Sequence, residues 1–183
     1  MPLLKEQFHT IDDIYALPDG ERAELIDGRI YNMTPPRRKH QRISSKLNTI
    51  IENYIASKQG SCEVYAAPFA VFLNNDQYTY VEPDLSIICD KNKLDEYGCN
   101  GAPDWIIEIV SPASKQMDYY NKLFKYREAG VREYWIVDPA RNQIMVHNFE
   151  EGEIATYAFD ETVKAGIYED LYIDFSKIPL DDM

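Results

Sequence analysis

The stretch Trp105-Ile106-Ile107-Glu108-Ile109-Val110 places a single carboxylate in a run of apolar residues. A run this rich in Ile, Val and Trp is typical of a strand buried on both faces of a sheet. An ionised glutamate there costs several kcal/mol unless a cation or hydrogen bonds compensate it. Glu108 is therefore the first candidate for a functional residue.

A second acid, Asp84, interrupts the apolar run from Val81 to Ile88. If the two strands pair with Asp84 opposite Glu108, both carboxylates come within reach of one ion. Mg²⁺ prefers oxygen ligands and keeps several waters, so one or two carboxylates and a substrate phosphate are enough to bind it. The alternative is that Asp84 only ends a strand and that Glu108 pairs with a buried lysine or arginine.

Asp104 competes with Asp84 for the role of second ligand, because it also follows a proline. It lies four residues before Glu108 on the same strand. An extended strand rises about 3.3 Å per residue, so the two acids are roughly 13 Å apart. They cannot share one ion unless the strand bends sharply, and Asp84 is therefore preferred.

The order of elements predicts an α/β fold with a mixed central sheet flanked by helices. We expect a short helix at Ile11–Tyr15, and a hairpin turning at Asp27-Gly28. A long helix should follow Pro35-Pro36, with Gly60 able to cap its end. Its apolar stripe is Ile43, Leu47, Ile50, Ile51, Tyr54 and Ile55.

The rest of the chain predicts further strands and a second helix. The helix should span Lys115–Ala129 and end at Gly130. We expect strands at Cys62–Ala66, Tyr78–Cys89, Trp105–Val110 and Glu133–Val137, and a C-terminal hairpin from Gln143–His147 and Ile154–Phe159.

Length and composition fit one globular domain over residues 1–183. The chain has 183 residues, of which 45% are hydrophobic, enough for a substantial core. No stretch approaches eighteen apolar residues, so no membrane segment is expected.

The cysteines Cys62, Cys89 and Cys99 are odd in number and lack C-x-x-C spacing. We therefore expect reduced thiols, no zinc site and a cytoplasmic protein.

The net charge of −12 argues at first against nucleic acid as a partner, because phosphate binding draws on Lys and Arg. The charge is unevenly distributed, however: ten acids and two lysines lie between Glu150 and Asp182. A basic cluster without acids contains Arg37, Arg38, Lys39, Arg42 and Lys46. A DNA contact and a solvated helix face both remain open for it.

Several ordered segments resemble the Uma-two family of putative restriction endonucleases, within the PD-(D/E)XK nuclease superfamily. They are Ala23-Glu24-Leu25-Ile26-Asp27-Gly28, Pro83-Asp84, Glu108-Ile109-Val110, Asp118-Tyr119-Tyr120-Asn121-Lys122, the block from Gly130 through Glu133-Tyr134-Trp135-Ile136-Val137 to Pro139, and Gly166 to Phe175. The resemblance extends from about Ile11 to Phe175. It implies a nuclease-like mixed sheet with additional N- and C-terminal hairpins.

The resemblance also implies roles for individual residues. Asp84 and Glu108 match the acids that bind Mg²⁺ or Mn²⁺. The signature lysine would fall at Val110, and the family pattern moves it to Lys122 on the following helix, with Lys125 as the competitor. An ammonium there could stabilise charge at the attacked phosphate. The family acid at Glu24 adds a ligand or holds a metal-bound water, or is an ordinary polar residue of the hairpin.

Residues around these acids are candidates for contact with DNA: Arg37, Arg38, Lys39, His40 and Lys125. His40 continues the buried stripe of the long helix, so a hydrogen-bonded histidine at the edge of the core is the simpler interpretation. Tyr119, Tyr120 and Tyr126 could stack on bases, but packing against the sheet explains them more simply.

The function expected is a metal-dependent endonuclease acting on DNA. One alternative is a catalytically silent nuclease fold that serves as a binding or regulatory module, which the acidic charge favours. Another is a mobile-element accessory nuclease that needs a partner protein. The C-terminal hairpin around Gly152 could also supply an edge for a homodimer.

Overall fold

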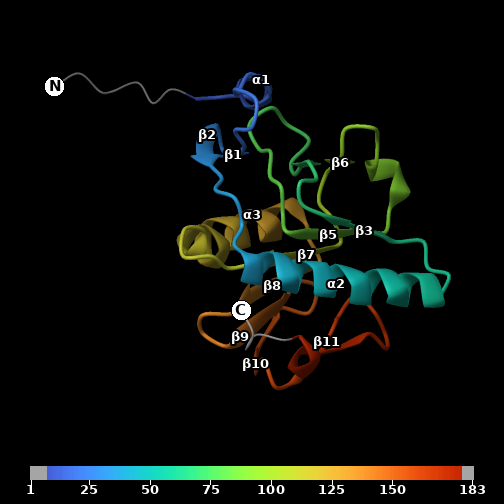
Figure 1. The fold of residues 1–183 in the computed structure, drawn as a ribbon. Helices are drawn as coiled ribbons and strands as arrows, with labels where there is room; N and C mark the ends of the chain where they lie inside the picture. The colour runs from blue at the N-terminus through green and yellow to red at the C-terminus, as the bar shows by residue number, and fades with distance from the viewer. Residues whose placement is uncertain (1–7, 179–183) are drawn as a thin grey trace.

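The computed structural model describes residues 8–178, and its centre is a six-stranded sheet (Figure 1). The strand order is β10-β9-β8-β7-β5-β3. β7 and β8 run parallel, and the other four neighbouring pairs are antiparallel. The strands are β3 (Glu63–Ala66), β5 (Leu85–Ile88), β7 (Trp105–Ile109), β8 (Glu133–Asp138), β9 (Gln143–Asn148) and β10 (Glu153–Ala158). The expected mixed sheet is confirmed.

The register of β5 and β7 brings the two candidate acids together. Leu85 pairs with Ile107, so the same register carried one residue further sets Asp84 opposite Glu108. The Asp84 N–H donates to the Glu108 Oε2 across 3.4 Å. The pairing assumed for the metal site is therefore present.

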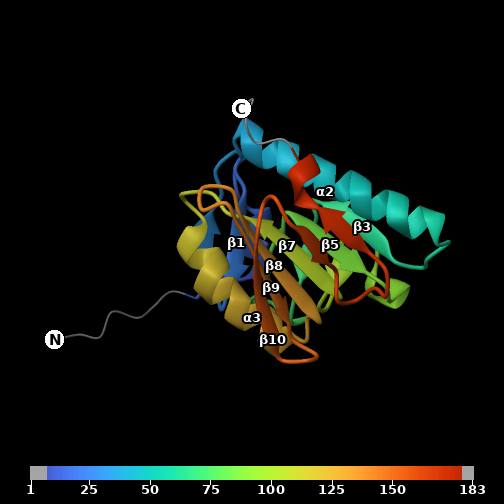
Figure 2. The same ribbon diagram turned by 90° about the horizontal axis from the view of Figure 1, so that it is seen from below.

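Helices and smaller sheets cover both faces of the central sheet (Figure 2). On one face lie α2 (Arg38–Ser57) and a two-stranded sheet of β11 (Thr162–Lys164) and β12 (Tyr172–Asp174), followed by η3 (Phe175–Lys177). On the other lie the π-helical turn η2 (Met117–Asn121) and α3 (Lys122–Ala129). Alternation along β7 sends Trp105, Ile107 and Ile109 to the α2 face, and Ile106 to the α3 face. Glu108, two residues beyond Ile106, also points toward α3.

The N-terminal part forms a hairpin of β1 (Ala23–Ile26) and β2 (Arg29–Asn32), preceded by α1 (Ile11–Tyr15). Asp27 and Gly28 both have positive φ, 50° and 74°, as a two-residue hairpin turn of type I′ requires. Leu25 bridges to Tyr80, which fixes the hairpin to the rest of the fold. The predicted N-terminal hairpin and short helix are confirmed.

The run Tyr78–Cys89 is not one strand, contrary to the expectation. β5 begins only at Leu85, and Val81 instead bridges to Val71 of β4 (Val71–Phe72). Pro83 between them lacks an N–H and cannot continue a ladder. β4 pairs with β6 (Cys99–Asn100), and η1 (Lys91–Lys93) lies between β5 and β6. This break turns the chain so that Asp84 lies at the start of β5.

The C-terminal hairpin also differs in part from the expectation. β9 and β10 are not an addition to the sheet: they are its last two strands, and β10 is an edge. The additional hairpin is the pair β11 and β12, which packs its buried Val163 and Ile173 into the core on the α2 side.

The end of α2 and the start of α3 differ from the expectation, whereas the end of α3 at Gly130 agrees with it. At the end of α2 the residue with positive φ is Gln59 (52°), and Gly60 contributes its N–H to Ile55 O at 3.0 Å. The second predicted helix contains the π-helical turn η2, and α3 proper begins at Lys122 and ends at Gly130 with φ 91°. None of the helices within residues 8–178 is long and apolar enough to cross a membrane.

The expectation of three reduced thiols is wrong for two of them. Cys62 and Cys89 form a disulfide, and their Cα atoms are 3.9 Å apart. Because Glu63 pairs with Ile88 across β3 and β5, the residues just beyond them face each other. Cys99 is free and buried. The sequence spacing alone gave no sign of this cross-strand pair.

Candidate active site

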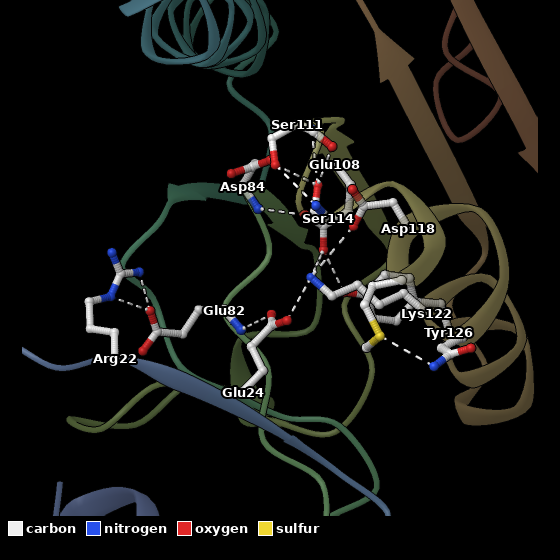
Figure 3. Close-up of polar contacts among 12 residues, drawn as sticks. Arg22, Glu24, Glu82, Asp84, Glu108, Ser111, Ser114, Asp118, Lys122 and Tyr126 are labelled. Atoms are coloured by element: carbon white, nitrogen blue, oxygen red, sulfur yellow. Dashed lines mark hydrogen bonds and ion pairs between the residues drawn. The ribbon is translucent and has the colours of Figure 1, made fainter. Parts of the chain in front are cut away.

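Glu108 and Lys122 meet in the interior, between β7 and the start of α3 (Figure 3). The Lys122 Nζ donates to Glu108 Oε1 at 2.9 Å, and the Tyr126 hydroxyl donates to the same oxygen at 2.7 Å. Glu108 and Lys122 are each only 4% exposed. The expensive carboxylate in the apolar strand is therefore compensated by a buried cation and a phenol.

Two more acids surround the same ammonium. Glu24 on β1 forms an ion pair with Lys122 at 2.9 Å, and Asp118 approaches it to 3.8 Å from one helical turn earlier. The Glu24 Oε1 also accepts the N–H of Glu82 at 3.0 Å, which fixes the glutamate against the chain before β5. Both acids are buried. The N-terminal hairpin, β7 and η2 thus each contribute a carboxylate to one cluster.

Asp84 lies at the more open side of this cluster. Its Oδ2 accepts the backbone N–H of Ile109 at 2.7 Å and lies 3.0 Å from the His40 Nε2. The side chains of Asp84 and His40 are 17% and 14% exposed. His40 comes from the first turn of α2 and Ile109 from the end of β7, so this helix and β7 hold the Asp84 carboxylate between them.

The cluster carries more negative than positive groups. Glu24, Asp84, Glu108 and Asp118 face one lysine and one histidine. Burial raises the pKa of Glu108 well above its usual value, although Lys122 opposes the shift. Burial also raises the pKa of Asp118, to about 6. An added cation would relieve this excess of buried negative charge.

The basic partners respond in the opposite sense. Burial alone would lower the pKa of Lys122, but Glu108, Glu24 and Asp118 more than offset it, and the pKa rises. Lys122 therefore stays an ammonium. Burial also works against the charged form of His40, and the hydrogen bond to Asp84 outweighs it and raises the pKa of the histidine.

Asp84 and Glu108 are the residues that could hold a metal ion. Their carboxylates come from neighbouring strands, and the long 3.4 Å contact from the Asp84 N–H is the one hydrogen bond found for Glu108 Oε2 within residues 8–178. Oxygen donors with excess negative charge suit Mg²⁺ or Mn²⁺. Across the same residues, however, no three His, Cys, Asp or Glu side chains converge into a ready-made metal site.

Lys125 and Asp104, the two competing candidates from the sequence, have other partners than Asp84 and Glu108. Lys125 pairs with Asp27 at 2.8 Å and with Glu128, so Lys122 and not Lys125 reaches Glu108. Asp104 accepts the N–H of Cys89 at 2.7 Å and pairs with Arg132. Asp104 is therefore engaged by a backbone N–H and by Arg132, and Asp84 as the second metal ligand stays a prediction.

The three tyrosines expected near Lys122 have three different environments. Tyr126 is fully buried against Glu108 and cannot stack on a base. Tyr119 donates to Asp138 at 3.0 Å. Tyr120 is 71% exposed, so it alone of the three is available to a ligand.

The basic residues Arg37, Arg38 and Lys39 lie at the start of α2, within three residues of His40. Arg37 and Arg38 are exposed and Lys39 is half-buried. His40 contacts Asp84, so the start of α2 lies beside the acid cluster. Their contact with DNA stays a prediction.

Sequence reasoning missed how Asp118 and Tyr126 take part in the site. In the sequence Asp118 stands out only as the first residue of the family-like segment that ends at Lys122, and Tyr126 only as an aromatic that packs or stacks. Both are spaced four residues from Lys122, one before and one after, so a helical face would have collected all three. That spacing was the available signal.

Comparison with solved structures agrees with this architecture. The chain superimposes with a TM-score of 0.74 on the crystal structure of a putative nuclease belonging to DUF820 from Anabaena variabilis. The match covers 92% of this chain and 96% of the other, at 22% identity. The mixed sheet with its flanking helices therefore defines a protein with a nuclease-type fold.

Sequence comparison gives the family. Residues 6–175 match the family described as Uma2, putative restriction endonuclease, and the chain belongs to this family. It is also 27% identical over 135 residues to an uncharacterized protein of Synechocystis sp., which covers 73% of this chain and 70% of the relative.

Proposed function

We propose that this protein is a divalent-metal-dependent endonuclease that hydrolyses phosphodiester bonds in DNA. The observation that carries the proposal is the buried cluster in which Glu24, Glu108 and Asp118 surround the Lys122 ammonium beside Asp84. Buried charge of this density is costly for stability and is typical of functional sites. Membership in a family of putative restriction endonucleases supports a nuclease over other hydrolases.

Asp84 and Glu108 would bind the ion, Mg²⁺ or Mn²⁺, as the family resemblance implies. When bound, the ion would polarise the phosphodiester and offset the charge that develops on it. The Ile109 N–H and His40 keep Asp84 oriented, and Tyr126 keeps Glu108 oriented. These contacts hold both carboxylates in place before any substrate arrives.

Lys122 and Glu24 complete the proposed site. The Lys122 ammonium lies within hydrogen-bond distance of Glu108 and Glu24, so a small movement would direct it to a phosphate oxygen bound beside Glu108. There it would stabilise negative charge in the transition state. Glu24 keeps the ammonium charged and positioned, and Arg37, Arg38 and Lys39 would contact the DNA backbone.

Cleavage assays on supercoiled plasmid and on single-stranded DNA test this function. With Mg²⁺ or Mn²⁺ the protein should nick DNA, and Glu108→Gln should remove nicking. Glu128→Gln is the matched control, because Glu128 is an exposed acid whose contact is with Lys125. Absence of metal-dependent cleavage on every such substrate would overturn the proposal.

A specific observation favours a second candidate, a catalytically silent binding or regulatory module. The Lys122 ammonium already pairs with Glu24 and Glu108, and no ready-made metal site exists among residues 8–178. In that case the cluster would be structural, and neither nicking nor Mn²⁺ binding would be measured. Dependence on a partner protein would appear as cleavage only after a basic partner is added.

A further inference from the structure

A hollow of about 510 Å³ lies between the hairpin of β1 and β2 and the outer side of η2 and α3. Its walls include four aromatic side chains: Phe8, Tyr31, Tyr120 and Phe124. Phe8 is 64% exposed, Tyr120 71% and Phe124 61%, and they are three of the eight large hydrophobic side chains that are exposed within residues 8–178. Exposed aromatic residues gathered around one hollow mark a binding surface.

Short-range contacts fix the walls of this hollow. The His9 N–H donates to Gly28 O at 2.8 Å and holds the adjacent Phe8 over the hairpin turn. A Cβ at Gly28 would lie 2.7 Å from the Phe8 ring, so the glycine permits this close approach. The ion pair of Lys125 with Asp27 ties the turn to α3. These contacts therefore hold Phe8, the hairpin turn and α3 together around the hollow.

The hollow adjoins the acid cluster. Ile26 in its wall is two residues after Glu24 on β1, and an extended strand places the two side chains on the same face about 7 Å apart. On the helix, Asn121 in the wall directly precedes Lys122, and Lys125 follows it by one turn. A phosphate bound at Lys122 would thus have its neighbouring nucleotide within reach of the hollow.

We propose that the hollow binds an unpaired nucleobase next to the reacting phosphate, stacked on Phe124 and Tyr120; this rests on the proposed nuclease function. Stacking on aromatic rings suits any base, because every base has a flat π-face. The wall also contains Asp27, Arg29 and Lys125. Charged residues are depleted from the cores of protein interfaces, so this lining suits a nucleotide better than a second protein.

The test compares two short strands with equal numbers of phosphates: an oligothymidylate, and a strand in which every nucleotide is abasic. Fluorescence anisotropy in EDTA measures binding without cleavage. Phe124→Ala should weaken binding of oligothymidylate about five-fold or more, the lower range for loss of one base–aromatic stack. It should leave binding of the abasic strand unchanged. Tyr172→Ala, at an exposed tyrosine on β12 (58% exposed), should change neither.

Three outcomes would overturn the proposal. One is equal binding of oligothymidylate by Phe124→Ala and the unmodified protein. The second is an equal loss for both strands, which would mean that the substitution disturbs phosphate contacts. The third is a dimer in sedimentation that Phe124→Ala converts to a monomer, which would make the hollow an interface between two copies. Because binding is measured without metal, it can succeed while plasmid nicking fails, or fail while nicking succeeds, so the two proposals are judged separately.

Discussion

Lys122 carries the positive charge within a buried group of acids. Its environment differs from that of Lys125, the other candidate lysine for the site. Lys122 is 4% exposed and pairs with two glutamates, whereas the Lys125 side chain is 21% exposed and pairs at the surface. Removing one partner of a buried ion pair leaves an uncompensated charge, and this costs far more than losing a surface pair.

Substituting these two lysines tests that difference. Lys122→Met should lower the free energy of unfolding by about 3 kcal/mol or more, because Glu24 and Glu108 lose their cation. Lys125→Met should lower it by less than about 1 kcal/mol. Urea unfolding in EDTA measures both. Equal, small losses would contradict the buried network.

The pKa of Asp118 gives a second prediction. Burial raises it to about 6 from the ordinary 3.8, so between these pH values the folded protein holds a proton that the unfolded chain has released. This contribution to stability is complete below about pH 4 and is lost as the pH rises through 6. Between pH 4 and pH 6 the free energy of unfolding should change by about 2–3 kcal/mol less in Asp118→Asn than in the unmodified protein. Unfolding curves in EDTA at pH 4 to 7 measure it, and an unchanged slope would contradict the shift.

The sequence predicted the placement of Asp84 beside Glu108 better than the groups that contact them. Asp84 opposite Glu108 followed from strand alternation and from exclusion of Asp104, and the register agrees. The choice of Lys122 over Lys125 needed the fold, since both lie on one helix. The ion pair of Lys122 with Glu24 joins residues almost a hundred positions apart. Hydrophobic periodicity along the sequence holds no information on such contacts.

At the scale of elements, α3 and its preceding π-helical turn position the site. The extra residue of a π turn shifts the helical face, and such turns occur often at functional sites. Here Asp118 lies inside the turn and Lys122 directly after it. The sequence predicted a continuous helix because apolar spacing does not distinguish one wider turn from a regular one.

The ends of α2 and α3 offer a matched pair of substitutions. Gln59 has φ 52° after α2, and Gly130 has φ 91° after α3. Gln59→Gly should stabilise the protein by up to about 1 kcal/mol, because the left-handed region is unfavourable for a residue with a Cβ. Gly130→Ala should destabilise it by about 1 kcal/mol; no atom lies within 4 Å of the new Cβ, so the cost is in the backbone. Thermal unfolding measures both effects. Shifts of Tm in the same direction for Gln59→Gly and Gly130→Ala would contradict these expectations.

The disulfide between Cys62 and Cys89 joins edge strand β3 to β5. The two cysteines are 27 residues apart in the sequence. Closing a loop of that length should contribute about 3 kcal/mol to the free energy of unfolding. Alkylation of the unfolded, unreduced protein followed by mass spectrometry should find one free thiol, Cys99, and Cys62→Ser should lower the free energy of unfolding by about this amount. Three free thiols would support the original expectation of a reduced chain.

At the scale of the whole molecule, the edge strand β10 leaves a homodimer as an open prediction. Its Ile154 is 67% exposed, and unpaired edges can add a strand from a second copy. If the edges pair, sedimentation at micromolar concentration should give a dimer, and Ile154→Lys should give a monomer. A monomer before substitution would remove the prediction.

The overall architecture was largely predictable, because hydrophobic periodicity and turn residues define the strands and helices of the central sheet. What the sequence did not predict is how smaller pieces pack around it: the break at Pro83, the added pair β11 and β12, and the hollow beside α3. Each depends on contacts between distant segments. The acid cluster has the same origin, since four separate parts of the chain supply Glu24, Asp84, Glu108 and Asp118.

In the proposed enzyme, Asp84 and Glu108 hold a divalent ion beside Lys122. A crystal of the protein soaked in Mn²⁺ tests this binding most directly through the anomalous signal of the metal. An anomalous peak is expected between the Asp84 and Glu108 carboxylates, and it should be absent from a crystal of Glu108→Gln soaked in the same way. No peak at this position, with the ion pairs of Lys122 to Glu24 and Glu108 intact, would contradict the proposed metal binding.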